Sequence, residues 1–131
     1  MKLHIHPEKL ITHDKIVMRQ TYYDNGQLRT EEYRLNGILH NPNGPAYRRW
    51  YKNRQLCLDE YFLNGKLHNP NGPAYRRWYE SGQLDYEEYY LNGKRHNPNG
   101  SAFRQWDENG QIDYESYYLN GVWFRNKNML N

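Results

Sequence analysis

The chain has 131 residues and a formal net charge of +3, with 37% hydrophobic and 16% aromatic residues. This length is typical of a single domain, and the weak positive charge excludes the strongly basic class of nucleic-acid-binding proteins. Cys57 is the one cysteine in the sequence, which excludes an internal disulfide and leads us to expect a reducing, cytoplasmic setting.

Residues 1–15 do not match the rest of the chain, and we expect them to form an N-terminal capping segment with a strand at residues 3–10. His, Pro and Glu interrupt their apolar residues, so we expect no signal peptide, and no later segment reaches membrane-spanning length. Ordinary polar roles are expected for the histidines, with metal ligation as an alternative because two histidines two apart share one face of a strand. The residues of that alternative site are His4, His6, His13 and Asp14.

The rest of the chain repeats every 28 residues. The segment HNPNGPAYRRWY at residues 40–51 returns at 68–79, and returns again as HNPNGSAFRQWD at 96–107. We therefore expect four repeats over residues 16–125, the first of them degenerate, followed by a tail at 126–131. Self-similarity at this period indicates stacked supersecondary units, so function is expected on a repeated surface rather than in a single pocket.

One repeat, at residues 73–100, contains two turn signals. Ser81-Gly82 and Asn92-Gly93 each lie between runs of β-favouring residues, as in two-residue hairpin loops. They predict strands at 74–80 and 83–91 and a short return before the connector Asn-Pro-Asn-Gly, with no helical pattern. The predicted fold is all-β: an elongated, single-layer antiparallel meander of 28-residue β-hairpin repeats.

A two-residue loop at Ser81-Gly82 also predicts which residues face each other across the two strands. The expected pairs are Tyr79 with Leu84, Trp78 with Asp85, Arg77 with Tyr86, and Arg76 with Glu87. A basic first strand thus opposes an acidic second strand, and each such pair stabilises the ladder by about 0.2–1 kcal/mol. We therefore expect the charged residues to serve mainly in stabilising the sheet.

Arg54 occupies a position that is glycine in the other repeats. We expect it to have a positive φ angle, which costs about 1 kcal/mol relative to glycine, so that Arg54→Gly would stabilise the protein.

Alternation along the strands places Ala74, Arg76, Trp78, Glu87, Tyr89 and Leu91 on one face. It places Tyr75, Arg77, Tyr79, Leu84, Tyr86, Glu88 and Tyr90 on the other. The predicted interaction surface follows the repeated aromatic and arginine columns, and consists of Trp50, Trp78, Trp106, Tyr61, Tyr89, Tyr117, Arg48, Arg76 and Arg104.

The segments YYDNGQLRTEEYRLNGI at residues 22–38 and WYESGQLDYEEYYLNGK at 78–94 resemble the variant MORN repeat. The form with an added HNPNGPA connector is similar to repeat proteins of large DNA viruses of amoebae. The resemblance covers residues 20–124. It implies elongated hairpin arrays that act as scaffolds, dimerisation modules or adaptors, with lipid-headgroup binding also proposed, and for a viral protein it implies the host cytoplasm or the virion.

We expect a non-catalytic scaffold that binds an unknown protein and also itself, as a dimer, without a cofactor. Neighbouring carboxylates such as Glu87 and Glu88 could be considered for acid–base chemistry, but they recur in nearly every repeat, which is typical of a structural role. An apolar tip at Trp123 and Phe124 is the expected site of self-association. The alternatives are single-stranded nucleic acid on the arginine and aromatic strands, and anionic lipid headgroups.

Overall fold

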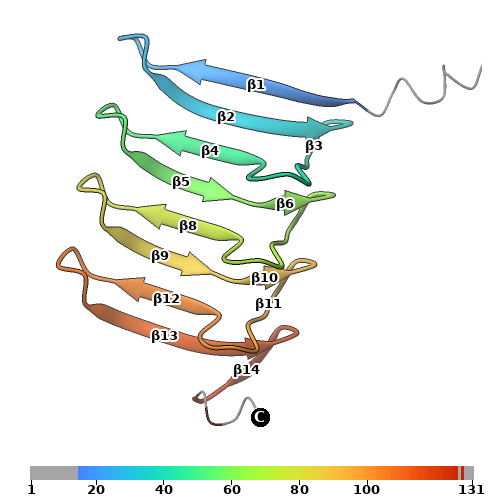
Figure 1. Cartoon of the computed structure of the whole chain (residues 1–131), viewed down its shortest axis with the longest axis vertical. Helices are drawn as coiled ribbons and strands as arrows, with labels where there is room; N and C mark the ends of the chain where they lie inside the picture. Colours follow the sequence, from blue (N-terminus) through green and yellow to red (C-terminus); the bar gives the residue numbers. More distant parts are fainter. Residues whose placement is uncertain (1–14, 127, 129–131) are drawn as a thin grey trace, which may run out of the picture.

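The computed structural model describes residues 15–126 and 128, and the fold is all-β, as predicted. Ten strands form one antiparallel sheet in a single layer, and two small two-stranded ladders lie along one side of it (Figure 1). The path through the sheet is β1-β2-β4-β5-β8-β9-β12-β13-β14, with β3 paired to β2. The predicted strand at residues 3–10 and the candidate metal site at His4, His6, His13 and Asp14 lie outside the described residues.

The first half of the chain contains β1 (Ile16–Tyr22), β2 (Leu28–Leu35), β3 (Ile38–Leu39), β4 (Tyr47–Trp50), β5 (Leu56–Glu60), β6 (Phe62–Leu63) and β7 (Lys66–Leu67). The second half contains β8 (Tyr75–Trp78), β9 (Leu84–Glu88), β10 (Tyr90–Leu91), β11 (Lys94–Arg95), β12 (Phe103–Trp106), β13 (Ile112–Leu119) and β14 (Val122–Phe124).

The second strand of the two middle repeats is divided, unlike the continuous strand that the sequence predicts. Its first part, β5 or β9, pairs with the first strand of the next repeat, whereas its second part, β6 or β10, pairs with its own return strand. The division falls at Tyr61 and Tyr89, whose N–H groups donate to Ala74 O and Ala102 O of the next repeat. The strand is therefore divided where it changes partner.

The two turns of a repeat have different structures. Asn92 (φ 50°) and Gly93 (φ 81°) both have positive φ and join directly paired strands, as a two-residue type I′ loop requires. At the other turn Gly82 has a positive φ of 93° but Ser81 does not, and the N–H of Tyr79 donates to Gln83 O. The loop therefore holds three residues, and the predicted two-residue loop at Ser81-Gly82 is wrong.

A β-bulge compensates for the longer loop. The register shifts between Arg77 and Trp78, so Trp78 lies opposite Leu84 and Asp85 is the extra residue. The predicted pairs of Trp78 with Asp85 and of Tyr79 with Leu84 are therefore wrong, and Leu84 shares a face with Trp78. Beyond the bulge the predicted pairs are confirmed: Arg77 lies opposite Tyr86 and Arg76 opposite Glu87.

The two faces of the sheet bury different groups. We call the face that carries Tyr61, Arg76 and Trp78 the groove face, and the opposite one the ring face. On the ring face a row of aromatic rings crosses the strands, with centroid separations of 5.3, 5.7 and 5.7 Å. The row consists of Tyr75, Tyr86, Phe103 and Tyr114. The aliphatic core is small, and Ala46, Ala74 and Ala102 are its fully buried residues.

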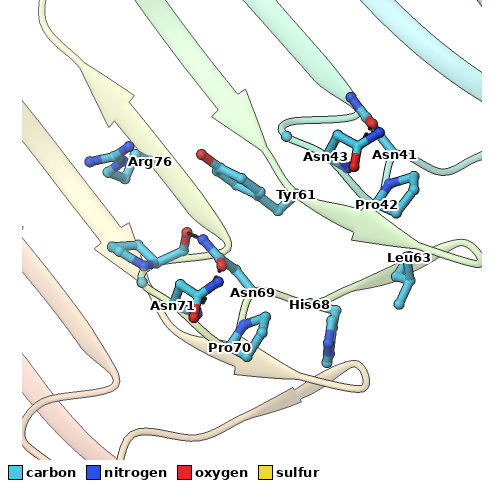
Figure 2. Close-up of a pocket in the computed structure, with 13 residues that line it drawn as sticks. Asn41, Pro42, Asn43, Tyr61, Leu63, His68, Asn69, Pro70, Asn71 and Arg76 are labelled. Atoms are coloured by element: carbon cyan, nitrogen blue, oxygen red, sulfur yellow. Dashed lines mark hydrogen bonds between the residues drawn. The ribbon is translucent and has the colours of Figure 1, made fainter.

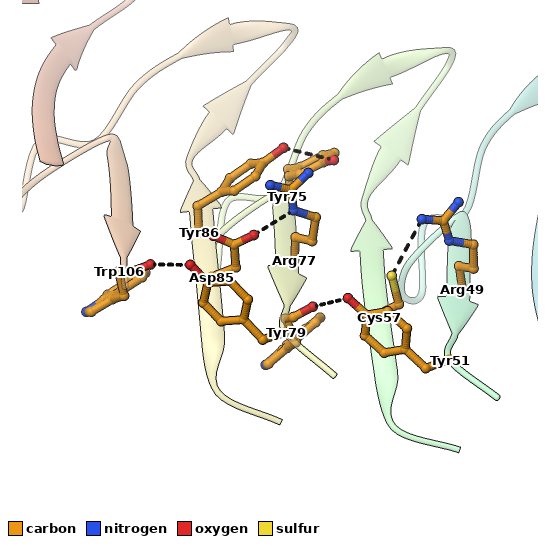
Figure 3. A network of polar contacts seen from close by, with 10 residues as sticks. Arg49, Tyr51, Cys57, Tyr75, Arg77, Tyr79, Asp85, Tyr86 and Trp106 are labelled. Atoms are coloured by element: carbon orange, nitrogen blue, oxygen red, sulfur yellow. Dashed lines mark hydrogen bonds and ion pairs between the residues drawn. The ribbon is translucent and has the colours of Figure 1, made fainter. Parts of the chain in front are cut away.

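Tyrosine bridges connect successive repeats on the ring face (Figure 3). The hydroxyl of Tyr79 donates to Trp106 O at 2.8 Å, and that of Tyr51 donates to Trp78 O at 2.7 Å. Burial raises the pKa of Tyr51 to about 12, so its hydroxyl remains a donor at neutral pH. Tyr23 makes the same bond to Trp50 O one repeat earlier. The spacing of 27 residues from donor to acceptor follows the sequence period.

Histidines make a second connection between repeats. The Nδ1 atoms of His40, His68 and His96 accept from backbone N–H groups of the next repeat at 2.9–3.0 Å. The donors are Asn64, Asn92 and Asn120, the first residues of the Asn-Gly turns. The repeated histidines thus have a structural role at the connector.

Candidate functional site

Two equivalent grooves lie on the groove face, one repeat apart. The first has a volume of about 580 Å³ and is shown in Figure 2; the second has a volume of about 430 Å³. Each is bounded by two successive Asn-Pro-Asn-Gly connectors, 41–44 and 69–72 in the first groove. The connector at 69–72 therefore forms a wall of both grooves.

Internal hydrogen bonds hold each connector in shape. Asn69 Oδ1 accepts from the N–H of Asn71 at 3.0 Å, and its Nδ2 donates to Pro73 O at 2.9 Å. Asn41 and Asn97 make the same pair of bonds in their own connectors. Because the asparagine side chain replaces missing backbone bonds, the groove walls are fixed before any ligand binds.

Tyr61 and Arg76 line the sheet side of the first groove, and Tyr89 and Arg104 line the second. The Nε of Arg76 lies 3.6 Å from Asp59 Oδ1, and its guanidinium carbon lies 5.3 Å from the centroid of the Trp78 ring. Its side chain is 34% exposed. Each groove thus offers a tyrosine ring and a positioned guanidinium between walls of proline and amide groups.

Charges of alternating sign cross the groove face in one row. Directly opposed residues of neighbouring strands form it, and in order they are Glu31, Arg48, Asp59, Arg76, Glu87, Arg104 and Glu115. With four carboxylates against three arginines, the row carries no positive excess.

Burial affects the carboxylates of this row. Asp59 is 2% exposed, and burial raises its pKa although Arg76 and Arg48 act in the opposite direction. Its Oδ1 has no hydrogen bond within the described part of the chain, which fits the long 3.6 Å contact to Arg76. Burial likewise raises the pKa of Glu87 against the opposing charges of Arg104 and Arg76. The row is therefore a buried structural element as well as a surface pattern.

The structure places the predicted interaction residues on one face but does not gather them all into the grooves. Trp50, Trp78 and Trp106 are half-buried and lie outside both grooves, as do Tyr117 and Arg48. The connector asparagines and prolines, which the sequence predicts only as turn formers, supply most of the groove walls. Their exact recurrence as Asn-Pro-Asn-Gly was the available signal, because a turn alone does not require that sequence.

The predicted tip is exposed in the monomer. Val122 and Trp123 are 60% and 56% exposed, whereas Phe124 is half-buried and lies opposite Tyr117. Leu39, Leu67 and Arg95 occupy the Trp123 position in the preceding repeats and are all half-buried. The exposure of Trp123 therefore reflects the end of the array.

Among the described residues, the side chains that could act in acid–base catalysis or bind a metal do not form a cluster. Glu87 lies in the charged row of the groove face, while its neighbour Glu88 is on the ring face and pairs with Arg95 at 2.9 Å. Over residues 15–126 and 128, no three metal-ligating side chains lie close enough together to hold an ion. Cys57 is buried and its sulfur accepts from Arg49 at 3.6 Å.

No protein family, curated protein or solved structure matches this chain. In the part of the chain that the structure describes, no helix is long and apolar enough to cross a membrane.

Proposed function

We propose that the protein is a non-catalytic repeat scaffold whose groove face binds an extended segment of another protein, and which also associates with itself. The observation that supports this most is the pair of equivalent, pre-shaped grooves one repeat apart. A site that recurs with the fold suits a ligand that also repeats along its length, such as an extended polypeptide. The variant MORN resemblance implies scaffolds, dimerisation modules or adaptors, which agrees with the scaffold part of this proposal.

The spacing of the grooves favours a particular backbone conformation. One repeat contributes two strands to the sheet, so equivalent points lie about 9.6 Å apart at about 4.8 Å per strand. A polyproline II segment advances about 9.3 Å in three residues. A segment lying across the strands would therefore place every third residue in a groove, against Tyr61 in one and Tyr89 in the next.

The charge distribution favours a protein over the two alternatives. Nucleic acid and anionic lipid both require an excess of positive charge on the contact surface. On the groove face each arginine of the charged row lies between two carboxylates, as Arg76 lies between Asp59 and Glu87. A peptide needs no such excess, since ring packing and amide hydrogen bonds provide its contacts.

The groove proposal can be tested with labelled peptides. We expect a fluorescein-labelled peptide with proline at two of every three positions to raise its anisotropy on binding, and a peptide of the same composition in scrambled order to bind at least fivefold more weakly. Tyr61→Ser should weaken binding several-fold, whereas Tyr47→Ser, a matched change of a half-buried tyrosine on the ring face, should leave it unchanged. Circular dichroism melting of both variants checks that they fold.

Labelled dT20 and phosphatidylserine vesicles are the competing probes. Binding of either one in 150 mM salt, without binding of the proline peptide, would contradict the proposal.

Self-association at the tip is tested separately. Trp123→Ala combined with Phe124→Ala should lower the mass measured by light scattering, because it removes an apolar surface that the monomer leaves exposed. An unchanged mass would place the self-contact elsewhere.

A further inference from the structure

Three joints between repeats recur inside the chain with the same contacts. At each joint the second strand of one repeat pairs with the first strand of the next, in the strand pairs β2–β4, β5–β8 and β9–β12. Each ladder contains three residue pairs, and in the last joint these are Glu88 with Phe103, Glu87 with Arg104, and Tyr86 with Gln105. The same edge-to-edge strand pairing therefore occurs three times within the chain.

The two ends of the sheet carry the two halves of a fourth such joint. All seven residues of β1 are exposed, and among the described strands β1 pairs with β2 alone. At the other end, β14 pairs with residues 117–119 of β13, whereas among the described strands residues 112–116 of β13 pair with β12 alone, and Ile112 and Tyr114 are 51% and 54% exposed. By their position in the repeat, Tyr114, Glu115 and Ser116 correspond to the residues that pair at the internal joints.

Contacts between glutamine side chains and the turns of the following repeat show the same pattern. The side chains of Gln55 and Gln83 lie over Gly82 and Gly110 of the following repeat, within 3.1–3.4 Å of where a Cβ would be. Gln27 contacts Arg54 at the same position, where Arg54 Nε donates to Gln27 Oε1 at 2.6 Å.

Gly26, the first member of this series, has nothing within 4 Å of its Cβ position among the described residues, and Gln111, the last glutamine, is exposed.

The Asn-Gly turns show the same arrangement. Lys66 lies over Gly93 and Lys94 over Gly121, with Cβ separations of 3.5 and 3.7 Å. Gly37 in the first repeat has nothing within 4 Å of its Cβ position among the described residues, and Val122 in the last is 60% exposed. Each of these three contacts, the strand ladder, the glutamine contact and the turn contact, joins one repeat to the next. At each end of the described sheet, one partner of each contact is therefore present without its counterpart.

We infer that β13 of one molecule pairs with β1 of a second copy, so that the molecules join head to tail and continue the internal sheet. The opposed residues would be Tyr114 with Thr21, Glu115 with Gln20, and Ser116 with Arg19. Because this contact uses two different surfaces, it need not close into a dimer and can extend into a chain of molecules. It specifies the self-association part of the proposed function and does not depend on groove binding.

The joint between molecules lacks three contacts that strengthen the internal joints. Gln20 stands where Arg48, Arg76 and Arg104 stand, so the charged row has a neutral amide at the junction. Asp107 occupies the position of the bridging tyrosines, and Phe124 that of the accepting histidines. Association should therefore be reversible and dependent on concentration.

Pairwise cysteine cross-linking tests the register directly. Thr21 and Tyr114 are both exposed, and directly opposed residues have Cα atoms about 4.5–5.5 Å apart, within the range of a disulfide. Thr21→Cys protein mixed with Tyr114→Cys protein should form a cross-linked dimer under mild diamide oxidation, while each variant alone should not. Wild-type protein, with buried Cys57, is the background control.

A change of charge at the joint gives a second, gain-of-function test. Gln20→Arg should place a guanidinium opposite Glu115 of the neighbouring molecule and strengthen association about 1.5- to 5-fold. Gln20→Glu, the matched control, should weaken it by a similar factor. Glu115→Gln in the Gln20→Arg background should remove the gain. Sedimentation velocity over a range of concentrations measures the association of wild-type protein and of the three variants.

Each outcome bears on one part of the inference. Cross-linking within a single variant, or oligomers in which the mixed pair does not cross-link, would overturn head-to-tail pairing and leave self-association intact. A monomer at every concentration would overturn both. Peptide binding to the groove face is measured independently, so loss of assembly with retained binding separates the joint from the groove.

Discussion

Arg54 provides a test of the turn geometry with a matched partner elsewhere in the chain. Its φ angle is +73°, at a position where Gly26, Gly82 and Gly110 have φ angles of 84–93°. This left-handed conformation costs a residue with a Cβ about 1 kcal/mol relative to glycine. The substitution Arg54→Gly removes that cost and also removes the hydrogen bond from Arg54 Nε to Gln27 Oε1.

The two effects can be separated by comparison with alanine. The exposed hydrogen bond to Gln27 is worth about 0.5 kcal/mol, the lower end of the usual net range. Arg54→Ala loses this bond and keeps the strained angle, so it should lower the free energy of unfolding by about 0.5 kcal/mol. Arg54→Gly should raise it by about 0.5 kcal/mol, because relief of about 1 kcal/mol exceeds the lost bond.

Scanning calorimetry measures the difference. With about 4 °C per kcal/mol for a domain of this size, Arg54→Gly should melt about 2 °C above wild type and about 4 °C above Arg54→Ala. Gly110→Ala is the reciprocal control: its Cβ would lie 3.4 Å from Gln83, an ordinary contact, so strain alone should lower the melting temperature by about 4 °C. Equal melting temperatures for the glycine and alanine variants at position 54 would refute the strain argument.

Two further substitutions test the connections between strands. Tyr79→Phe removes the hydroxyl that donates to Trp106 O, and should lower the free energy of unfolding by about 0.5–1.5 kcal/mol in a denaturant titration. Tyr22→Phe, which removes an exposed hydroxyl, should change it less, and equal losses would count against the bridge. For Asp59, burial raises the pKa above the unfolded value, so the folded state binds more protons and ionisation weakens the fold. The contribution of Asp59 to stability should therefore grow as the pH falls toward the unfolded pKa of its carboxyl group, and the free energy of unfolding should depend less on pH in Asp59→Asn than in wild type; an identical pH profile would show that Asp59 is not responsible.

The sequence is informative where one residue type alone satisfies a local requirement. Asn92-Gly93 specifies its loop because asparagine and glycine adopt positive φ readily, and opposed charges such as Arg76 and Glu87 set the ladder register. At Ser81-Gly82 glycine alone adopts positive φ, which is compatible with a longer loop and a bulge. A change in loop length and a bulge can cancel in register, so the pattern far from the turn does not reveal them.

The grooves were not predictable for a different reason. Their walls are connectors from successive repeats, so their shape depends on how one repeat stacks on the next. The asparagine that fixes each wall, such as Asn69, bonds within its own connector, but the groove forms between that connector and the one 28 residues away. The turn residues of a connector therefore predict the shape of that connector, but not the groove that forms between two connectors.

The same stacking explains why the ends differ from the middle. The two middle repeats bury their bulge residues, Cys57 and Asp85, which are 2% and 6% exposed, whereas Arg29 in the first repeat and Asp113 in the last are exposed. A repeat with a neighbour on each side therefore buries a position that the first and last described repeats leave exposed. A second copy offers the same strand, turn glycines and spacing that an additional repeat would offer, with weaker contacts at Gln20, Asp107 and Phe124. The head-to-tail joint that we infer would therefore continue the array through a weaker and reversible contact.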